Sequence, residues 1–376
     1  MTRAPRVLVS AVALAQPIGG VRRQAIELLP RVARLLHEEG GGLDLLVGSG
    51  GLPEDLERRL PQDVGRFRAP VPAGGPLARS MVEGRALRAA IRAAADRGAA
   101  YDLLHVGHLS VAKVPLPFSF LIHDLRDLEP DAPTWRRVFA RRLLPATFAR
   151  AAVVMTVSET MRAELLGHWP ELADKVAVVR HGSDHLLVHP RAPGPLDPAG
   201  GDPRAPILFL GHLERRRNPM LLVEMLARCP DLPPVLFVGA PKKAEDLRLR
   251  ARARQLGVEE RVQFHGPASE ERLPWLLATA GCLVVPSRVE GFGIPALEAQ
   301  RAGLPLAVAR AGALPEVSAP GTPTFEVDDP DACAEAVRAA LAARPAQLEA
   351  AQRFADGFHW DTSAEQLFRT WRSASR

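Results

Sequence analysis

Tyrosine, cysteine and lysine are scarce in this chain of 376 residues, which has one tyrosine, three cysteines and four lysines. The cysteines, Cys229, Cys282 and Cys333, are far apart in sequence and show no metal-ligand spacing. A chain of this length does not need disulfides for stability, so a reducing cytosol fits best. No basic block with interleaved aromatic residues is present, which argues against a nucleic-acid partner. No apolar run approaches the roughly 18 residues of a membrane-spanning helix.

The N-terminal run VLVSAVALA follows two arginines and imitates the apolar centre of a signal peptide. It continues into QPIGGVRRQAIELLPRVARLL, which has the pattern of a loop and an amphipathic helix. This continuation favours a first buried strand, and we expect a cytoplasmic protein.

The net charge of +5 is unevenly distributed. Residues 1–190 contain 25 basic and 20 acidic side chains, whereas the rest of the chain contains 23 of each. Residues 134–153, TWRRVFARRLLPATFARAAV, mix arginines with large apolar side chains. Two interpretations are open for this segment. It is either a helix that rests on an anionic membrane surface, which would place the protein peripherally at the inner face of the membrane, or a core helix with solvated arginines.

Strand-like apolar runs alternate with helix-like segments along the whole chain, as in RVLVSAVAL, LDLLVGS, ILFLGHL and GCLVVPS. Such alternation predicts parallel sheets with crossover helices. The chain also exceeds the usual size of one hydrophobic core. We therefore expect an α/β protein with two Rossmann-like, doubly wound domains that face a cleft. The expected first domain is 1–188, a Pro/Gly-rich linker follows at 189–206, and the second domain is 207–355.

Residues 287–303, SRVEGFGIPALEAQRAG, follow one of the strand-like runs. Two glycines give the loop backbone freedom, Pro295 suits the first turn of a helix, and Gly303 suits its C-terminal cap. A strand, a glycine loop and a helix start together direct free N–H groups and a partial positive charge at an anion. The pattern predicts a phosphate site at the helix start, Ile294–Pro295.

Two carboxylates flank this predicted phosphate site, Glu290 in the loop and Glu298 about one turn into the helix. The oxygens of Glu298 can accept hydrogen bonds from hydroxyls beside the anion, and Glu290 lies on the other side. A nucleotide sugar, with phosphate in the middle and hydroxyls at both ends, satisfies all three features. The alternative is that Glu298 only interacts with the helix dipole and that Glu290 is a solvated loop acid.

Other residues at the expected carboxyl ends of strands have side chains or backbones suited to phosphate or proton chemistry. Ligands of doubly wound sheets gather at these ends. The loops there contain Gly19 and Gly20 after the first strand, His123 after FLI, residues 211–218 after ILFL, and His265 after VQF.

Five ordered segments resemble the retaining GT-B glycosyltransferases of family 4, the glycosyl transferases group 1 with an E-x7-E signature. VVPSRVEGFGIPALEAQRAGLPLAVARAGALPEV is similar to the signature, and VQFHGPASEERLPWLLATAGCLVVPS to the segment before it. VMTVSETMRAELL with VAVVRHGSD is similar to the end of the family's N-terminal domain, and ILFLGHLERRRNPMLLVEML to the start of its C-terminal domain. FADGFHWDTSAEQLFRTWR resembles the closing helix. The resemblance implies that residues 356–376 cross back to the first domain.

The resemblance also implies roles for matching residues of the second domain. Glu290 is expected to hold sugar hydroxyls near the reaction centre and Glu298 to hold the ribose. The backbone that assists Glu290 is that of Gly291, Phe292 and Gly293.

In the first domain, the resemblance places Gly19 and Gly20 beside the diphosphate, where a backbone without side chains can approach closely. An ordinary tight turn is the alternative for these glycines. His123 matches a family histidine near the reaction centre, where a neutral imidazole can accept or orient an acceptor hydroxyl. A capping or core histidine is the alternative. His105 and His108 are taken as pocket-lining or structural residues.

The chain departs from the family pattern in GHLERRRNP. Family members commonly have arginine after the glycine and lysine before the asparagine, both for the leaving diphosphate, and here these positions are His212 and Arg217. Arginine preserves the charge at the second position. Histidine supplies only a conditional charge or a neutral donor at the first, so Arg215 or Arg216 is the alternative contact to the leaving group.

The activity implied is hexosyl transfer from a nucleoside diphosphate sugar, GDP-mannose or a UDP-sugar, to a hydroxyl acceptor with retention of configuration. The nucleotide sugar is a co-substrate and no other cofactor is expected. Because the chain has no Asp-rich metal motif near the site, we expect helix N-termini and arginine to stabilise the leaving diphosphate without a metal.

The acceptor is expected on the more basic first domain, as a glycan, a lipid-linked intermediate or a small hydroxyl compound. Two other interpretations stay open, since a fold does not fix a function. One is a catalytically silent homologue that binds nucleotide sugars. The other is a sugar-nucleotide epimerase or a phosphorylase on the same scaffold.

Overall fold

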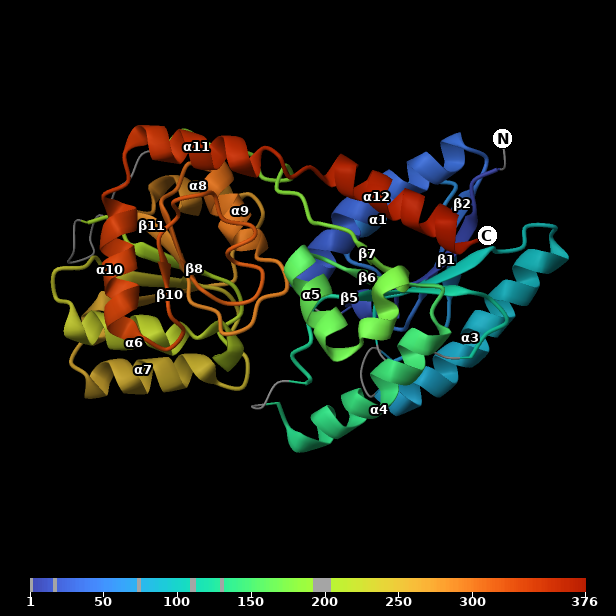
Figure 1. Cartoon of the computed structure of the whole chain (residues 1–376), viewed down its shortest axis with the longest axis horizontal. Helices are drawn as coiled ribbons and strands as arrows, with labels where there is room; N and C mark the ends of the chain where they lie inside the picture. Colours follow the sequence, from blue (N-terminus) through green and yellow to red (C-terminus); the bar gives the residue numbers. More distant parts are fainter. Residues whose placement is uncertain (1–2, 16–18, 73–75, 109–112, 129–131, 192–203) are drawn as a thin grey trace. The chain divides into compact units, whose positions relative to one another are not determined.

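A computed structural model describes residues 3–15, 19–72, 76–108, 113–128, 132–191 and 204–376, with the backbone alone at 76–80 (Figure 1). The chain divides into two compact units. Unit 1 contains residues 1–181 and 360–376, and unit 2 contains residues 182–359. Unit 1 thus ends earlier than the boundary expected at residue 188. Most of the expected linker at 189–206 lies outside the described residues.

Unit 1 is built on a seven-stranded parallel sheet with the order β3-β2-β1-β4-β5-β6-β7. The strands are β1 (Arg6–Ser10), β2 (Gly42–Val47), β3 (Gly65–Arg68), β4 (Leu103–Val106), β5 (Phe118–Ile122), β6 (Val153–Thr156) and β7 (Val176–Val178). Every residue of β4 and β5 is buried, as expected for apolar strands covered on both faces. The strand order reverses between β1 and β4, and this is the position where such sheets bind ligands.

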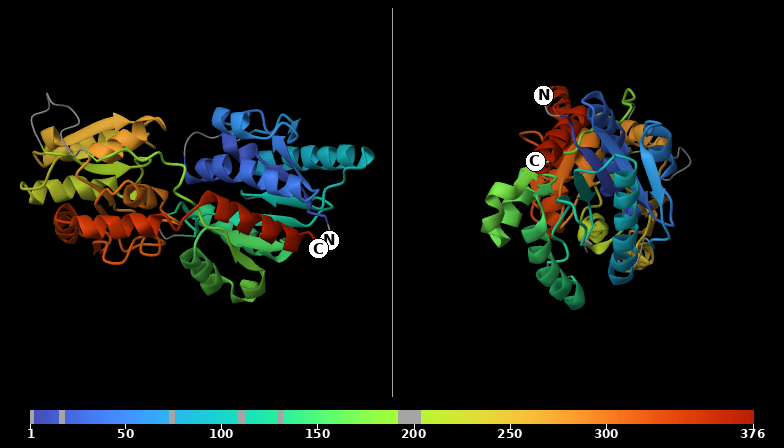
Figure 2. Two further views of the ribbon diagram at one scale, coloured as in Figure 1. Left: turned by 90° about the horizontal axis from the view of Figure 1, so that it is seen from above. Right: turned by 90° about the vertical axis from the view of Figure 1, so that its right-hand side faces the viewer.

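The helices of unit 1 are α1 (Gly20–Glu38), α2 (Glu54–Arg59), α3 (Pro76–Asp96), α4 (Thr134–Arg150), α5 (Glu159–His168) and α12 (Trp360–Ala374). The last of these lies beside α1, from the other end of the chain (Figures 1 and 2). Trp360 and Trp371 of α12 are fully buried. The salt bridge Arg31–Asp361, at 2.8 Å, joins the two helices, and Arg372 pairs at 2.6 Å with Glu39, the residue that follows α1. The return of the C-terminal helix to the first domain is confirmed.

Unit 2 contains a six-stranded parallel sheet with the order β10-β9-β8-β11-β12-β13. Its strands are β8 (Ile207–Leu210), β9 (Val235–Val238), β10 (Val262–Gly266), β11 (Cys282–Val285), β12 (Leu306–Ala309) and β13 (Thr324–Phe325). Here the order reverses between β8 and β11. The prediction of two doubly wound α/β units is confirmed.

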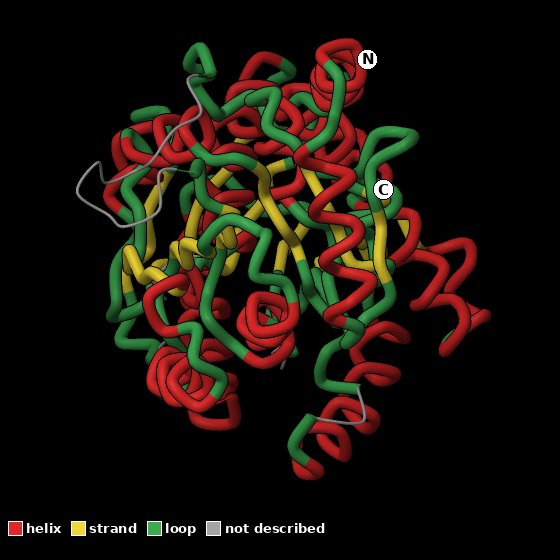
Figure 3. Tube along the Cα trace, turned by 90° about the vertical axis from the view of Figure 1, so that its left-hand side faces the viewer, coloured by secondary structure: helices red, strands yellow, loops and turns green. Residues whose placement is uncertain are grey.

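The helices of unit 2 are α6 (Pro219–Arg228), α7 (Glu245–Gln255), α8 (Arg272–Thr279), α9 (Ile294–Arg301), α10 (Pro330–Leu341) and α11 (Pro345–Ala355). Helix α6 packs with α7 and α10, whereas α9 packs with α11 (Figure 1). Helices cover the strands, as the colouring by secondary structure shows (Figure 3).

Helix α9 forms as its sequence predicts. It begins directly after Gly293, whose φ of 106° favours glycine, and Pro295 is its second residue, where no intrahelical donor is required. Gly303, with φ of 66°, follows its end as a C-terminal cap.

Candidate active site

The loops that follow β8 and β11 meet where the strand order of unit 2 reverses. The Arg288 backbone N–H donates to the Arg216 carbonyl at 2.8 Å, and the Arg216 guanidinium donates to the Val289 carbonyl at 3.3 Å. Asn218, at the end of the first loop, donates to Asp328 at 2.9 Å, and Asp328 also binds the Arg288 guanidinium. These contacts fix the two loops against each other, so side chains from both have defined positions.

Arg217 and Glu290 form an ion pair across these loops. Arg217 Nη1 lies 3.2 Å from Glu290 Oε2, and the two side chains are only 12% and 10% exposed. The Ser287 hydroxyl donates to the same carboxylate oxygen at 3.3 Å. An ion pair with so little water around it is electrostatically stronger than a surface pair. The geometry therefore places a cation and a carboxylate side by side where the strand order of unit 2 reverses, the switch point of its sheet.

The backbone of Glu290 is held as firmly as its side chain. Its carbonyl accepts a hydrogen bond from Ala313 N–H at 2.9 Å. The backbone passes so close at Gly312, with φ of 50°, that a Cβ there would lie 2.2 Å from the same carbonyl oxygen. Only glycine allows this approach.

A second acidic side chain, Glu214, lies close to three cationic side chains of the site. Its carboxylate lies 2.9 Å from Arg216, 3.9 Å from Arg217 and 3.4 Å from Lys242. Backbone hydrogen bonds between Leu213 and the loop after β9 bring Lys242 into place. The three cations face two carboxylates, which leaves a net positive charge. Sequence reasoning missed Glu214 and Lys242, although a lysine pair after a strand was a usable signal.

Glu298 lies in α9, with its side chain 8% exposed. Its Oε1 accepts a hydrogen bond from His185 Nε2 at 2.9 Å, and the His185 side chain is 4% exposed. Sequence reasoning did not select His185, which follows the HGSD stretch of the chain. Glu290 and Glu298 thus lie before and after the N-terminus of α9, and each has a fixed cationic or N–H partner.

The remaining predicted residues of unit 2 differ in their surroundings. Gly291, Gly293 and Ile294 are buried in the signature loop and helix start, as is Phe292, whose ring contacts Phe358 edge-on with centroids 6.2 Å apart. His212 Nδ1 lies 3.4 Å from the Ala240 carbonyl. His265 is exposed on the edge strand β10, and β9 and β8 separate it from β11. The Gly239 N–H donates to the carbonyl of Gly266, the residue after His265, at 2.8 Å, and the role of His265 in donor binding stays a prediction.

In unit 1, Gly19 precedes α1 and Gly20 is its first residue, and residues 16–18 of the same loop lie outside the described residues. Among the residues that the structure describes, no atom lies within 4 Å of the position that a Cβ on Gly19 would take.

His123 follows β5 in unit 1. Its ring is 6.1 Å from that of His181, which in turn stacks on Trp360 at 5.5 Å. Burial lowers the pKa of His123 to about 4, with Asp124 opposing and Arg126 adding to the shift. At neutral pH the imidazole is uncharged and can accept a hydrogen bond from a hydroxyl. His105 differs, because it binds Ser119 at 3.0 Å and packs on Trp371, which makes it structural.

A cluster of buried polar side chains lies where the strand order of unit 1 reverses, between β1 and β4. His108 Nε2 is 3.0 Å from both carboxylate oxygens of Glu83, and the Ser10 hydroxyl donates to Glu83 Oε1 at 2.5 Å. Ser10 ends β1 and His108 follows β4, so these are the two strands where the order reverses. The other ring nitrogen, Nδ1, is buried and has no hydrogen-bond partner among the described residues. Sequence reasoning missed Glu83 and Ser10, because Glu83 reads as an ordinary helix acid.

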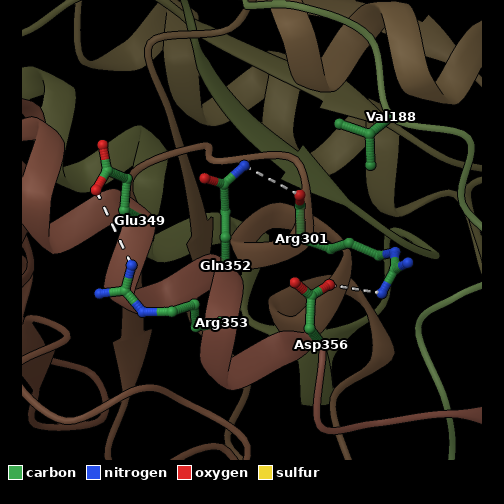
Figure 4. Close-up of a pocket in the computed structure, with 6 residues that line it drawn as sticks. All are labelled: Val188, Arg301, Glu349, Gln352, Arg353 and Asp356. Atoms are coloured by element: carbon green, nitrogen blue, oxygen red, sulfur yellow. Dashed lines mark hydrogen bonds and ion pairs between the residues drawn. The ribbon is translucent and has the colours of Figure 1, made fainter.

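A surface pocket lies at the opposite end of α9 from Gly293 (Figure 4). Its lining residues are Val188, Arg301, Glu349, Gln352, Arg353 and Asp356. The charged groups pair with one another, Arg301 with Asp356 at 3.0 Å and Arg353 with Glu349 at 4.0 Å. The pocket is therefore separate from the Arg217–Glu290 pair. Its lining residues Arg301 and Gln352 connect the end of α9 to α11.

Within the described ranges, no three His, Cys, Asp or Glu side chains are grouped as metal ligands. The helices of those ranges include none that is both long enough and apolar enough to cross a bilayer.

Solved structures similar to this chain define the class of protein. Sucrose-phosphate synthase from Thermosynechococcus elongatus superposes with a TM-score of 0.78 and 19% identity, covering 98% of each chain. HepE from Anabaena, in complex with UDP and glucose, has a TM-score of 0.69 and 20% identity over 97% of this chain and 99% of its own. The fold is that of the GT-B glycosyltransferases.

Sequence comparisons then identify the family. The family model for Glycosyltransferase Family 4 matches residues 18–185, and that for Glycosyl transferases group 1 matches residues 201–356. A D-inositol 3-phosphate glycosyltransferase of Streptomyces avermitilis is 31% identical over 75% of this chain and 67% of its own length. One from Catenulispora acidiphila is 28% identical over 96% and 93%. The chain belongs to glycosyltransferase family 4, and it is a glycosyltransferase.

Proposed function

We propose that this enzyme transfers a hexosyl unit from a nucleoside diphosphate sugar to a hydroxyl acceptor with retention of configuration and without a metal. The observation that carries the proposal is the placement of Glu290, paired with Arg217, and Glu298 before and after the N-terminus of α9. A diphosphate at that N-terminus would face the positive end of the helix dipole and the Arg217 guanidinium. Glu290 would then hold sugar hydroxyls and Glu298 would hold the ribose.

Stabilisation of the leaving diphosphate is the main catalytic contribution in this proposal. The Arg217 guanidinium is preorganised by Glu290, so little reorganisation is needed as negative charge develops. Arg216 and Lys242 add to the positive potential. Two similar structures support a nucleotide as the ligand. HepE was solved with UDP, and starch synthase IV from Arabidopsis thaliana, with a TM-score of 0.69, was solved with ADP.

The surroundings of Glu290 also support retention by front-face attack. One of its oxygens already accepts from Arg217 and Ser287. A carboxylate whose charge is offset in this way is a weak nucleophile, so a covalent glycosyl-enzyme of the hydrolase type is disfavoured. In our proposal the acceptor hydroxyl attacks the anomeric carbon from the side of the departing phosphate, and a phosphate oxygen takes the proton.

The acceptor is assigned to unit 1, where His123 offers a neutral imidazole to a hydroxyl. The names of the relatives, D-inositol 3-phosphate glycosyltransferases, support a polyol hydroxyl as one class of acceptor, beside glycans and lipid-linked sugars. GDP-mannose and UDP-sugars are the proposed donors.

Titration with nucleotide sugars tests the donor site. Glu298→Ala should weaken the binding of UDP- or GDP-sugars about tenfold or more, because a charge-assisted hydrogen bond to the ribose is lost. Glu260→Ala, a change of an exposed glutamate in the same unit, is the matched control. Unchanged donor affinity in Glu298→Ala would remove the ribose assignment.

Release of nucleoside diphosphate separates the proposed transferase from its alternatives. A transferase releases it in an acceptor-dependent manner, an epimerase releases none in the steady state, and a silent homologue binds the donor without turnover. Either of the last two results would contradict the proposal.

We also propose that α4 places the enzyme peripherally on an anionic membrane. Trp135 and Val138 lie one turn apart on α4 and are 62% and 55% exposed, and the exposed Arg141 and Arg142 follow them. Vesicles that contain phosphatidylglycerol should co-sediment with the wild type and less with Trp135→Ala. Leu247→Ala removes an equally exposed side chain of unit 2 and should bind as the wild type does. Equal binding of both variants would contradict the proposal.

A further inference from the structure

His185 holds one oxygen of Glu298, the carboxylate assigned above to the ribose. The two residues are 113 positions apart in sequence, and their side chains are 4% and 8% exposed. Because a carboxylate only accepts hydrogen bonds, the Nε2–H of His185 is the donor. Burial of a carboxylate is unfavourable unless such a partner is present, so the contact is a strong constraint on where the Glu298 side chain lies.

The segment that carries His185 is fixed to unit 2 on both sides of this residue. Ser183 donates two hydrogen bonds, from its backbone N–H to the Phe358 carbonyl at 3.0 Å and from its hydroxyl to the Ala355 carbonyl at 3.1 Å. Arg191 donates to the carbonyls of Leu277 and Ala280 at 3.1 and 3.0 Å. His185 is therefore placed by its backbone and does not depend on Glu298 for its position.

Helix α9, which carries Glu298, is fixed independently of His185. Arg301 at its end pairs with Asp356, and the Gln352 amide donates to the Arg301 carbonyl at 3.5 Å (Figure 4). Inside the helix, Gln300 donates to the Val317 carbonyl at 2.8 Å and accepts from Ala319 N–H at 2.7 Å. With both backbones fixed, the hydrogen bond sets the orientation of the carboxylate.

We propose that His185 is a positioning residue for donor recognition: it holds Oε1 of Glu298 so that the other oxygen accepts a hydrogen bond from a ribose hydroxyl. The donor site is selective for ribonucleotides over deoxyribonucleotides through this pair. The inference rests on the proposed function of Glu298. Fixing a carboxylate before the ligand arrives lowers the entropic cost of binding, and a buried acceptor left without its hydroxyl disfavours the deoxy analogue.

The test compares ribose discrimination by calorimetric titration in the wild type and in variants of His185, His359 and Glu298. The probes are UDP, GDP and ADP and their 2′-deoxy and 3′-deoxy counterparts, and the discrimination is the ratio of dissociation constants. We expect the wild type to prefer the best ribonucleotide over at least one deoxy counterpart about tenfold or more. His185→Phe, which has no donor, should lose most of this ratio. His185→Gln should keep most of it, because its amide can donate, whereas the shorter His185→Asn should lose it.

His359→Phe is the matched control, since His359 contacts the neighbouring Asp184 at 3.7 Å and is half exposed. It should keep the wild-type ratio. An equal loss of affinity for ribo- and deoxyribonucleotides in His185→Phe would show a merely structural role and overturn the inference. If His185→Phe does not fold, a wild-type ratio in His185→Asn overturns it equally.

Glu298→Ala separates this inference from the proposed function. If Glu298→Ala loses the ratio and the His185 variants keep it, the ribose role stands and the positioning role falls. If Glu298→Ala keeps the wild-type ratio, or if the wild type binds none of the nucleotides, the proposed donor site falls and the inference falls with it.

Discussion

Arg217 and Glu290 face each other at 3.2 Å in a part of unit 2 that water hardly reaches. The carboxylate orients the guanidinium, and the guanidinium offsets the carboxylate charge. This pair explains how an arginine, Arg217, can replace the lysine that the family commonly has at this position. Arginine retains the positive charge of the lysine, and its planar guanidinium can bind Glu290 with one N–H and a phosphate with the others. At the first position of the same motif, His212 Nδ1 lies 3.4 Å from the Ala240 carbonyl.

Replacement of Arg217 should lower turnover strongly. Arg217→Ala should lower kcat about a hundredfold to a thousandfold, as for other donors to a developing negative charge, and Arg217→Lys should recover part of it. Steady-state release of nucleoside diphosphate measures both. Arg254→Ala, which removes a surface arginine paired with Glu259, should leave the rate unchanged. A near-normal rate in Arg217→Ala would contradict this role and would make Arg215 or Arg216 the better candidate for the contact to the leaving diphosphate.

Gly312 should tolerate no side chain, because a Cβ there would meet the Glu290 carbonyl oxygen at 2.2 Å. Gly312→Ala should therefore unfold more readily than the wild type and lose activity, since the loop that carries Glu290 must shift. The matched control is Gly257→Ala. Gly257 has a φ of 69°, close to the 50° of Gly312, but within the described part of the chain no atom beyond its chain neighbours lies within 4 Å of its Cβ position. The backbone strain of about 1–2 kcal/mol is common to both variants. Equal losses of stability, with activity kept in both, would contradict the close contact.

The free energy of unfolding should fall as the pH decreases from about 6.5 to 4. Burial lowers the pKa of His105 to about 3, with His123 and His108 adding to the shift, and lowers that of His123 to about 4. In the unfolded chain both titrate near 6.5, so in this window the unfolded state binds protons that the folded state does not. Each group contributes a slope of at most about 1.4 kcal/mol per pH unit, and this slope fades to nearly zero about one unit above pH 6.5.

Urea unfolding between pH 4.5 and 7.5 measures this dependence. His105→Asn should show a shallower decline than the wild type, because one of the two histidines is removed. The same decline in both proteins would mean that His105 does not titrate as described.

Activity should be insensitive to chelation. In the proposed mechanism α9 and Arg217 stabilise the diphosphate, so EDTA at millimolar concentration should leave the rate within about twofold of its starting value. Loss of activity that Mg²⁺ or Mn²⁺ restores would contradict a metal-independent mechanism.

The features that the sequence predicted are those determined by local pattern. Buried strands read as Val- and Leu-rich runs, and the glycines and Pro295 marked the start of α9 because each residue has a conformational preference of its own. Glu290 and Glu298 could be proposed together because both lie within one strand, loop and helix. The resemblance to family 4 added the return of α12 to unit 1.

The features that the sequence did not predict depend on contacts between distant residues. His185 meets Glu298 across 113 positions, and Glu83 meets His108 across 25, so no local pattern marks either pair. Glu214 and Lys242 come together only because the loops after β8 and β9 are neighbours in the sheet.

Donor turnover in wild type and Glu290→Gln tests the central claim most directly. The purified enzyme is incubated with GDP-mannose and a set of UDP-sugars, with and without polyol acceptors, and the released nucleoside diphosphate and the anomeric configuration of the product are measured. We predict release from at least one donor, a product with the configuration of the donor, and a loss of turnover in Glu290→Gln. An inverted product, or undiminished turnover in Glu290→Gln, would contradict the account.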